Sequence, residues 1–215
     1  MIGQAIALVL ARPGEFLDAL LTHVALSAAA LAVAIALAVP AGLLLSRRAA
    51  AALLTINAAN VAKTVPSLAV LALMLPILGT GFLPALVALI LLALPSILIN
   101  TVGAIVRVDA DVVGAATAMG MTPRQIARRI ELPLAVPVVF AGIRTAAVEV
   151  VASATLASFI GGGGLGDFIT AGIAMSEMSQ LLVGAVPVAL LTVATELGFA
   201  TLQRELTPRG LRVAA

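Results

Sequence analysis

The chain alternates long apolar stretches with short polar interruptions. Five apolar stretches follow one another, at residues 24–45, 53–78, 83–106, 134–160 and 181–202. Each is long enough to cross the hydrocarbon core of a bilayer as a helix, which takes about 20 apolar residues. The pattern therefore predicts an all-α integral membrane protein with about five transmembrane helices in a single domain, residues 1–215.

Two of the polar interruptions are less regular than the others. Lys63 and Thr64 precede Pro66 inside the second apolar stretch, and a proline within a helix removes a backbone hydrogen bond and kinks it. We expect a kinked span there, with a re-entrant segment as the alternative. Near the N-terminus, Arg12, Pro13 and two acidic residues break an apolar run. Residues 1–22 are therefore predicted to form a short interfacial segment, with a frayed tail as the alternative.

Composition supports a membrane protein and excludes several kinds of site. The chain is 62% hydrophobic and only 10% charged, with a mean hydropathy of +1.22, whereas soluble domains are about 25% charged. The absence of cysteine excludes disulfides and thiolate-bound metals. The sequence has no phosphate-binding loop motif, and His23 is its one histidine. We expect no catalytic residue, no metal site, no cofactor and no nucleic-acid binding in this chain, and we interpret His23 as an interfacial residue.

The basic residues lie mostly on one side of the membrane if five spans alternate. Lys and Arg are enriched in cytoplasmic loops, so this side is predicted to be the cytoplasm, with the N-terminus outside. Residues 107–133 then form a cytoplasmic loop and residues 203–215 a cytoplasmic tail. The residues on this side are Arg47, Arg48, Arg107, Arg124, Arg128, Arg129, Arg204, Arg209 and Arg212.

The longest polar interruption, residues 113–133 (VGAATAMGMTPRQIARRIELP), is predicted to form two short helices with a break at 121–123. Thr122 is suited to cap the second helix, and Pro123 fits its first position. This helix has the two-faced pattern of an element that docks onto a partner. Ile126 and Ile130 share one face, and Arg124, Arg128 and Glu131 share the opposite face.

The same loop resembles the EAA loop of bacterial ABC-importer permeases, written E-A-A, a glycine, nine residues, I-x-L-P. The matching residues are Gly114–Ala115–Ala116, Gly120 and Ile130–Glu131–Leu132–Pro133, and Gly114 stands where the family usually has glutamate. In that family the loop forms coupling helices that sit in a groove of the ATP-binding subunit. The coupling residues implied by the resemblance are Gly114, Ala115, Ala116, Gly120, Arg124, Ile126, Arg128, Ile130, Leu132 and Pro133.

Further segments resemble the permeases of osmoprotectant importers, which carry glycine betaine, choline, carnitine or proline betaine. They are TVPSLA at 64–69, AGIRTA at 141–146, ATLASFI at 154–160 and GGLGDFI at 163–169, and the similarity covers residues 24–202. Methionine-importer permeases share the five-span plan and the glycine-rich segment and are the alternative. A stand-alone secondary transporter is a remote alternative, because no internal repeat is visible.

The resemblance implies a type I ABC-importer permease fold in the bacterial cytoplasmic (inner) membrane. It also implies two ATP-binding subunits, which hold ATP and Mg, an extracytoplasmic substrate-binding protein, and a second permease subunit that is identical or a sister. Quaternary ammonium ligands are held by aromatic cages, and this chain has no Trp, no Tyr and only 6 Phe. We therefore expect the binding protein to select the substrate.

Ionisable residues within spans are candidates for the translocation path, because they are costly in a membrane and face a bundle interior or a wet cavity. Lys63 and Glu149 are expected at similar depth and form a hypothetical pair, and Arg144 is expected to meet Glu196 or a helix end. Packing of the bundle is the alternative role for these residues. The candidates for the path are Lys63, Pro66, Arg144, Glu149 and Glu196.

The glycine-rich segment is predicted to shape the outer gate or the surface that meets the binding protein. Its candidate residues are Gly163, Gly164, Gly166 and Asp167. Glycines permit positive φ and close backbone approach. Asp167 is expected to cap the following helix, or else to contact the binding protein.

Overall fold

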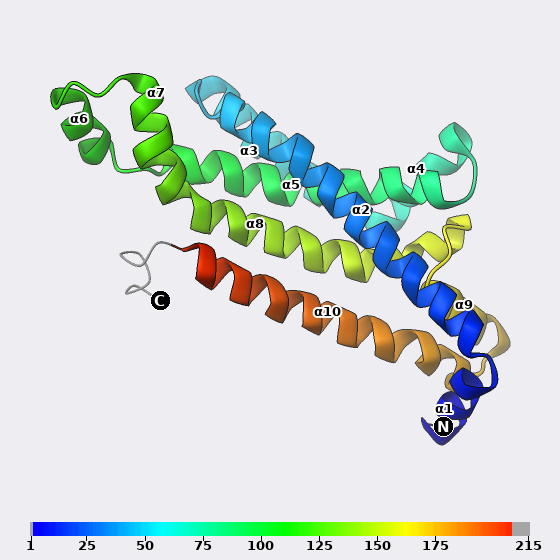
Figure 1. Ribbon diagram of the computed structural model, residues 1–215. Helices are drawn as coiled ribbons and strands as arrows, with labels where there is room; N and C mark the ends of the chain where they lie inside the picture. The colour runs from blue at the N-terminus through cyan, green and yellow to red at the C-terminus, as the bar shows by residue number, and fades with distance from the viewer. Residues whose placement is uncertain (1, 208–215) are drawn as a thin grey trace. The chain divides into compact units, whose positions relative to one another are not determined.

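A computed structural model describes residues 2–207, and every regular element within that range is a helix (Figure 1). The α-helices before the central loop are α1 (Ile2–Ala11), α2 (Pro13–Leu45), α3 (Ala49–Lys63), α4 (Ser67–Leu78) and α5 (Phe82–Val106). The loop contains α6 (Ala110–Ala118), α7 (Pro123–Ile126) and a π-helical turn, η1 (Ala127–Glu131). The remaining elements are α8 (Leu132–Ser153), a 3₁₀ segment, η2 (Ala154–Ile160), α9 (Gly166–Met175) and α10 (Met178–Leu206).

The helix lengths confirm an all-α membrane fold. Four helical stretches are long and apolar enough to cross a bilayer, and α3 and α4 together make a fifth candidate. The four are Pro13–Leu45, Phe82–Val106, Pro123–Ile160 and Met178–Leu206. The third predicted span, residues 83–106, matches α5 to within one residue. The side of the membrane on which each terminus lies stays a prediction.

The second predicted span is broken more sharply than a kink. The axes of α3 and α4 differ by 91° across the break. Pro66 has no N–H to donate, and it also disfavours helical geometry at the preceding Val65. The Thr64 hydroxyl instead donates to the Val61 carbonyl at 2.7 Å, which completes the end of α3. This geometry fits a broken span and a re-entrant segment equally well.

The N-terminal segment is ordered as a helix, so the interpretation as a frayed tail is wrong for the described residues. α1 ends at Ala11, and α2 begins at Pro13, eleven residues before the predicted start of the first span at residue 24. Proline is favoured at a first helical position, and Glu15 in the first turn complements the helix dipole. Arg209 and Arg212, predicted in the cytoplasmic tail, lie outside the described residues.

The chain divides into two compact units, and each unit takes segments from several helices. Unit 1 comprises Met1–Ala34, Val65–Ala93 and Ala146–Leu197. Unit 2 comprises Ile35–Thr64, Leu94–Thr145 and Gly198–Ala215. The large side chains fully buried in unit 1 include Leu26, Leu71, Leu89 and Leu165.

Small residues allow elements to pack closely in both units. In unit 1, a Cβ at Gly172 would collide with the backbone of Leu181, and one at Gly184 with the Leu165 carbonyl. In unit 2, a Cβ at Gly142 would collide with the Asn100 side chain. Small residues at helix contacts are how membrane helices approach closely without a hydrophobic driving force. The cluster near the start of α8 in unit 2 consists of Ala104, Ile105 and Ala135, with Leu43, Leu132 and Val139 packed against it.

Candidate functional site

The central loop, residues 107–133, is hereafter the docking loop, and its first helix presents an open face. The Asp109 side chain caps α6 by accepting from the Asp111 N–H at 2.8 Å. Ala116 is buried, whereas Val112 and Met119 are exposed. Gly114 and Ala115 are also exposed, and a Cβ at Gly114 would meet nothing within 4 Å. α6 therefore rests on Ala116 and leaves its other face free for a partner.

Gly120 forms the turn between the two short helices. Its φ is +81°, in the region that favours glycine, and a Cβ there would meet nothing within 4 Å. The Met121 N–H donates to the Ala116 carbonyl at 3.1 Å, which folds the turn back onto α6. Glycine is thus favoured at this position for its backbone geometry rather than for space.

The predicted cap of the second helix is confirmed. The Thr122 hydroxyl accepts from the Gln125 N–H at 3.4 Å, and the Gln125 side chain accepts from the Thr122 N–H at 2.8 Å. This reciprocal pair is a capping box, with Pro123 at the first helical position. It fixes the direction in which α7 leaves the turn.

The predicted faces of this helix are correct except for Glu131. Ile126 is buried and Ile130 is half-buried, while Arg124 and Arg128 are exposed. Glu131 was predicted on the face of the arginines, but its side chain is only 14% exposed and accepts from Arg47 at 2.6 Å. The π-helical turn at Ala127–Glu131 explains the difference, because an inserted residue rotates the side chains after it by about 100°.

A basic surface remains on the exposed side of the docking loop. Arg124, Arg128 and Arg129 line a hollow of about 450 Å³ together with Gln125. All four side chains belong to α7 and the π-helical turn, which continue directly into α8. Leu132, at the start of α8, packs against the buried cluster of Ala104, Ile105 and Ala135. The surface is thus polar outside and anchored by apolar contacts inside.

The cationic candidates for the path have polar contacts within unit 2. The Lys63 ammonium donates to the hydroxyl of the buried Ser96 at 2.9 Å, beside the break at Pro66. Arg144 donates to the Gln203 side chain at 3.4 Å, and Gln203 donates in turn to the Pro137 carbonyl at 3.0 Å. These contacts place Lys63 next to α5, and Arg144 next to the end of α10.

The acidic candidates belong to unit 1. Glu149 lies on α8 and Glu196 on α10, and both side chains are half-buried. The pairing of Lys63 with Glu149 and the pairing of Arg144 with Glu196 stay hypotheses.

The glycine-rich segment of unit 1 packs over His23. Gly161, Gly163 and Gly164 have positive φ values of 73°, 74° and 95°. A Cβ at Gly164 would contact the His23 backbone and ring at 3.4 Å. His23 is only 1% exposed, and its Nε2–H donates to the Val151 carbonyl at 3.0 Å. His23 therefore packs inside unit 1, which a hydropathy pattern does not reveal, and its position at the membrane interface stays a prediction.

Asp167 was expected to cap α9, but it does not. Leu165 is the N-cap residue, and no side-chain capping hydrogen bond is made at this position. Asp167 instead lies exposed in the first turn, where its charge complements the helix dipole. Gly166 is buried, and a Cβ there would collide with the Thr155 carbonyl.

Comparison with known protein families identifies the family of this chain. A family described as the binding-protein-dependent transport system inner membrane component matches residues 30–209. The chain belongs to this family. The permease is accordingly a multi-pass component of the inner membrane, and the family description makes it a transport subunit rather than an enzyme.

Curated relatives support the resemblance found in the sequence. The choline transport system permease protein OpuBB of Bacillus subtilis (strain 168) is 41% identical over 199 residues, covering 93% of this chain and 92% of the relative. The carnitine transport permease protein OpuCB of Listeria monocytogenes is 44% identical over 192 residues, covering 89% and 88%. The predicted kinship with permeases of osmoprotectant ABC importers is thus confirmed.

A solved structure supports the fold alone. In an inward facing conformation of the MetNI methionine ABC transporter, a chain matches the permease with a TM-score of 0.77 and 22% identity. The match covers 90% of this chain and 97% of that chain. The predicted type I ABC-importer permease fold is therefore confirmed.

The contact between Arg47 and Glu131 is a feature that sequence reasoning missed. Arg47 follows the first predicted span, and Glu131 precedes the fourth. In a five-span plan both positions lie on the same side of the membrane. That sidedness together with their opposite charges was the available signal for the pair.

Proposed function

We propose that the permease forms half of the translocation path of an ATP-driven importer for osmoprotectants. The substrates are quaternary ammonium compounds such as glycine betaine, carnitine or choline. The observation that carries the proposal is the docking loop, which combines a free α6 face with a basic surface on α7. The names of the curated relatives, which include choline and carnitine permeases, support this substrate class.

In this proposal the docking loop receives a partner ATPase on the cytoplasmic side. Exposed apolar residues flanked by arginines are typical of a surface that a partner covers. Met119 and Val112 supply the apolar contacts, and Arg124, Arg128 and Arg129 supply the charges. Two such ATPases serve two permease subunits, and they hold the ATP and Mg.

The docking loop transmits motion because it is continuous with a span. α7, the π-helical turn, α8 and η2 form one helical stretch, Pro123–Ile160. A displacement of α7 by the ATPase therefore moves α8 directly. This continuity gives the coupling free energy between nucleotide state and the path a physical carrier.

Substrate choice is assigned to a separate binding protein. The permease has no Trp or Tyr with which to build an aromatic cage. The exposed Asp167 and the glycine-rich segment at residues 161–166 are proposed to meet that binding protein on the outer side. Lys63, Arg144, Glu149 and Glu196 are proposed to line or brace the path.

The proposal is tested by uptake into proteoliposomes that hold the complete complex with its ATPase and binding protein. We expect labelled glycine betaine, carnitine or choline to accumulate only when ATP and Mg are supplied to the ATPase side. An ATPase variant unable to hydrolyse ATP is the control and is expected to abolish uptake. Accumulation of methionine instead, or uptake by the permease alone, would contradict the proposal.

A further inference from the structure

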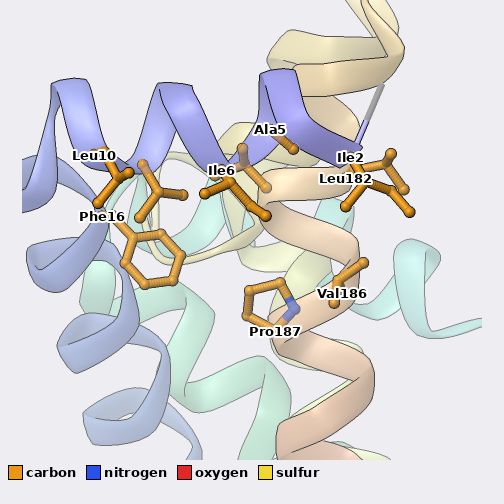
Figure 2. A pocket seen from close by; sticks show the side chains of 10 residues that line it. Ile2, Ala5, Ile6, Leu10, Phe16, Leu182, Val186 and Pro187 are labelled. Carbon is orange, nitrogen blue, oxygen red and sulfur yellow. The ribbon is translucent and has the colours of Figure 1, made fainter.

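An apolar cavity lies between α1 and the first turns of α10, within unit 1. Its volume is about 260 Å³, and its lining includes Ile6, Phe16, Val183, Val186 and Pro187. Figure 2 shows α1 passing across α10, with Phe16 on one side of the cavity and Pro187 and Val186 on the other. The volume is just below the roughly 300–1,000 Å³ of pockets for drug-sized ligands. It suits part of a hydrocarbon chain rather than a whole lipid.

α1 itself has the character of a segment covered by lipid. It spans ten residues, carries no charged residue and has no buried residue. Ile2 is 73% exposed and Leu10 is 75% exposed. Ten residues are too few to cross a bilayer, which takes about 20. An apolar helix too short to span is expected to lie along the membrane boundary with its apolar side chains in the acyl region.

A second cavity of about 240 Å³ adjoins the first and is polar at one side. The two share Val9, Phe16 and Val183 in their linings. The polar groups of the second cavity are Arg12, Glu15, Glu177 and Gln180. Because the linings overlap, the two cavities make one cleft, hereafter the α1–α10 cleft, with an apolar end and a charged end.

The charged end is held in place by the backbone around it. Ser176, with φ of 55°, ends α9, and the Glu177 N–H donates to the Gly172 carbonyl at 2.8 Å. The hydroxyl of the buried Ser179 donates to the Glu177 carboxylate at 3.0 Å. Glu177 is thus fixed at the rim of the cleft, although its side chain is exposed.

Arg12, the cation of the cleft, makes only a weak ion pair and can bind another anion in its place. Arg12 contacts Glu15 at 3.5 Å, and both side chains are more than half exposed. Such a pair contributes little free energy. Arg12 directly precedes α2, and Glu177 directly precedes α10. Charged groups at the ends of spanning helices lie at the membrane surface, at the level of lipid headgroups.

From this arrangement we propose that the α1–α10 cleft binds one phospholipid with an amine in its headgroup, such as phosphatidylethanolamine. The phosphate lies against Arg12, the ammonium group against Glu177 and Glu15, and part of an acyl chain fills the apolar end. A lipid with only an anionic headgroup satisfies Arg12 but leaves two carboxylates facing a negative charge. Charge complementarity therefore favours the zwitterionic amine lipid.

The test is native mass spectrometry of the purified transporter complex after reconstitution in nanodiscs with equal phosphatidylethanolamine and phosphatidylglycerol. We expect the complex to retain phosphatidylethanolamine preferentially. Glu177→Gln is expected to lower that preference about two- to fivefold, the scale of one partly exposed ion pair. The control is Asp18→Asn, which removes an exposed carboxylate of α2 that lines neither cavity.

A second pair of variants tests the apolar end. Val186→Phe fills the cavity and is expected to lower retention of both lipids, whereas Val193→Phe, two turns along α10 at an exposed position outside the cavity, leaves retention unchanged. The proposal is overturned if the unmodified complex retains both lipids equally, if Glu177→Gln behaves as Asp18→Asn, or if the cleft is covered by a second copy of the chain.

Discussion

Gly120 and Gly166 satisfy two different physical requirements with the same residue type. Gly120 is exposed, has a φ of +81° and has open space where a Cβ would stand. Gly166 has no positive φ, is buried, and has the Thr155 carbonyl where a Cβ would stand. One glycine serves a turn on a free surface, and the other serves contact between two backbones.

The two glycines belong to segments that are held in the fold in different ways. The docking loop is held by a buried Ala116 and Ile126, a capping box and one ion pair. In the glycine-rich segment, close packing leaves no space for a Cβ at Gly162 and Gly166, whereas Gly161, Gly163 and Gly164 have positive φ instead. We expect the first kind of attachment to suit the surface proposed to dock an ATPase, and the second to suit the surface proposed to meet the binding protein.

The largest expected effect is on folding, at Gly166. Gly166→Ala introduces a methyl group into the Thr155 carbonyl and is expected to destabilise the permease by about 1–3 kcal/mol, as overpacking of a core does. Thermal unfolding of the complex in detergent measures the loss. Gly114→Ala is the matched control: it has open space and ordinary helical φ, so we expect a neutral change or a gain of up to about 1 kcal/mol. Equal effects of Gly166→Ala and Gly114→Ala would show that close packing does not distinguish Gly166 from a glycine with open space around it.

The next effect is on coupling, at Gly120. Gly120→Asp is expected to leave insertion in the membrane intact and to lower uptake per ATP hydrolysed at least about fivefold, the low end of allosteric couplings. The reason is a negative charge placed in the basic surface that is proposed to meet the ATPase. Uptake and hydrolysis are measured together in proteoliposomes.

The control for this prediction is Gly120→Asn, which matches aspartate in size and also tolerates positive φ. We expect it to remain close to the unmodified permease, so that the two variants separate charge from backbone strain. Normal uptake in Gly120→Asp would show that the turn is not part of the coupling surface.

The sequence predicted structural features well where they depend on neighbouring residues alone, as the limits of a span and a helix cap do. The span at residues 83–106 is bounded by Gly81 and Arg107, and its limits were found to within one residue. Thr122 and Pro123 act through the backbone next to them, so the cap was predictable. The charged residues Glu15 and Asp18 were misinterpreted as an interruption, because a helix that extends beyond the bilayer also carries charges in its first turns.

Features that depend on distant residues were not predictable in this way. Pro66 predicts a break but not the 91° bend, which depends on what α4 packs against. His23 gives no sign in the sequence of its bond to Val151, 128 residues away. The prediction of the helix face on which Glu131 lies was wrong. The extra residue of the π-helical turn changes the direction of each later side chain, and the sequence gives no sign of it.

The smallest predicted effect concerns the pair of Arg47 and Glu131, a polar contact between the turn after α2 and the end of the docking loop. Arg47 is 46% exposed and Glu131 14%, so solvent screens the pair in part. A double-mutant cycle with Arg47→Met and Glu131→Gln is expected to give a coupling energy of about 0.5–1 kcal/mol in thermal unfolding, decreasing as salt is raised. Arg48→Met, which changes the exposed neighbouring arginine, serves as the control and should not couple to Glu131. A coupling larger than the effect of Gly166→Ala would mean that the docking loop is fixed as firmly as the glycine-rich segment, and the contrast between the two kinds of attachment would fail.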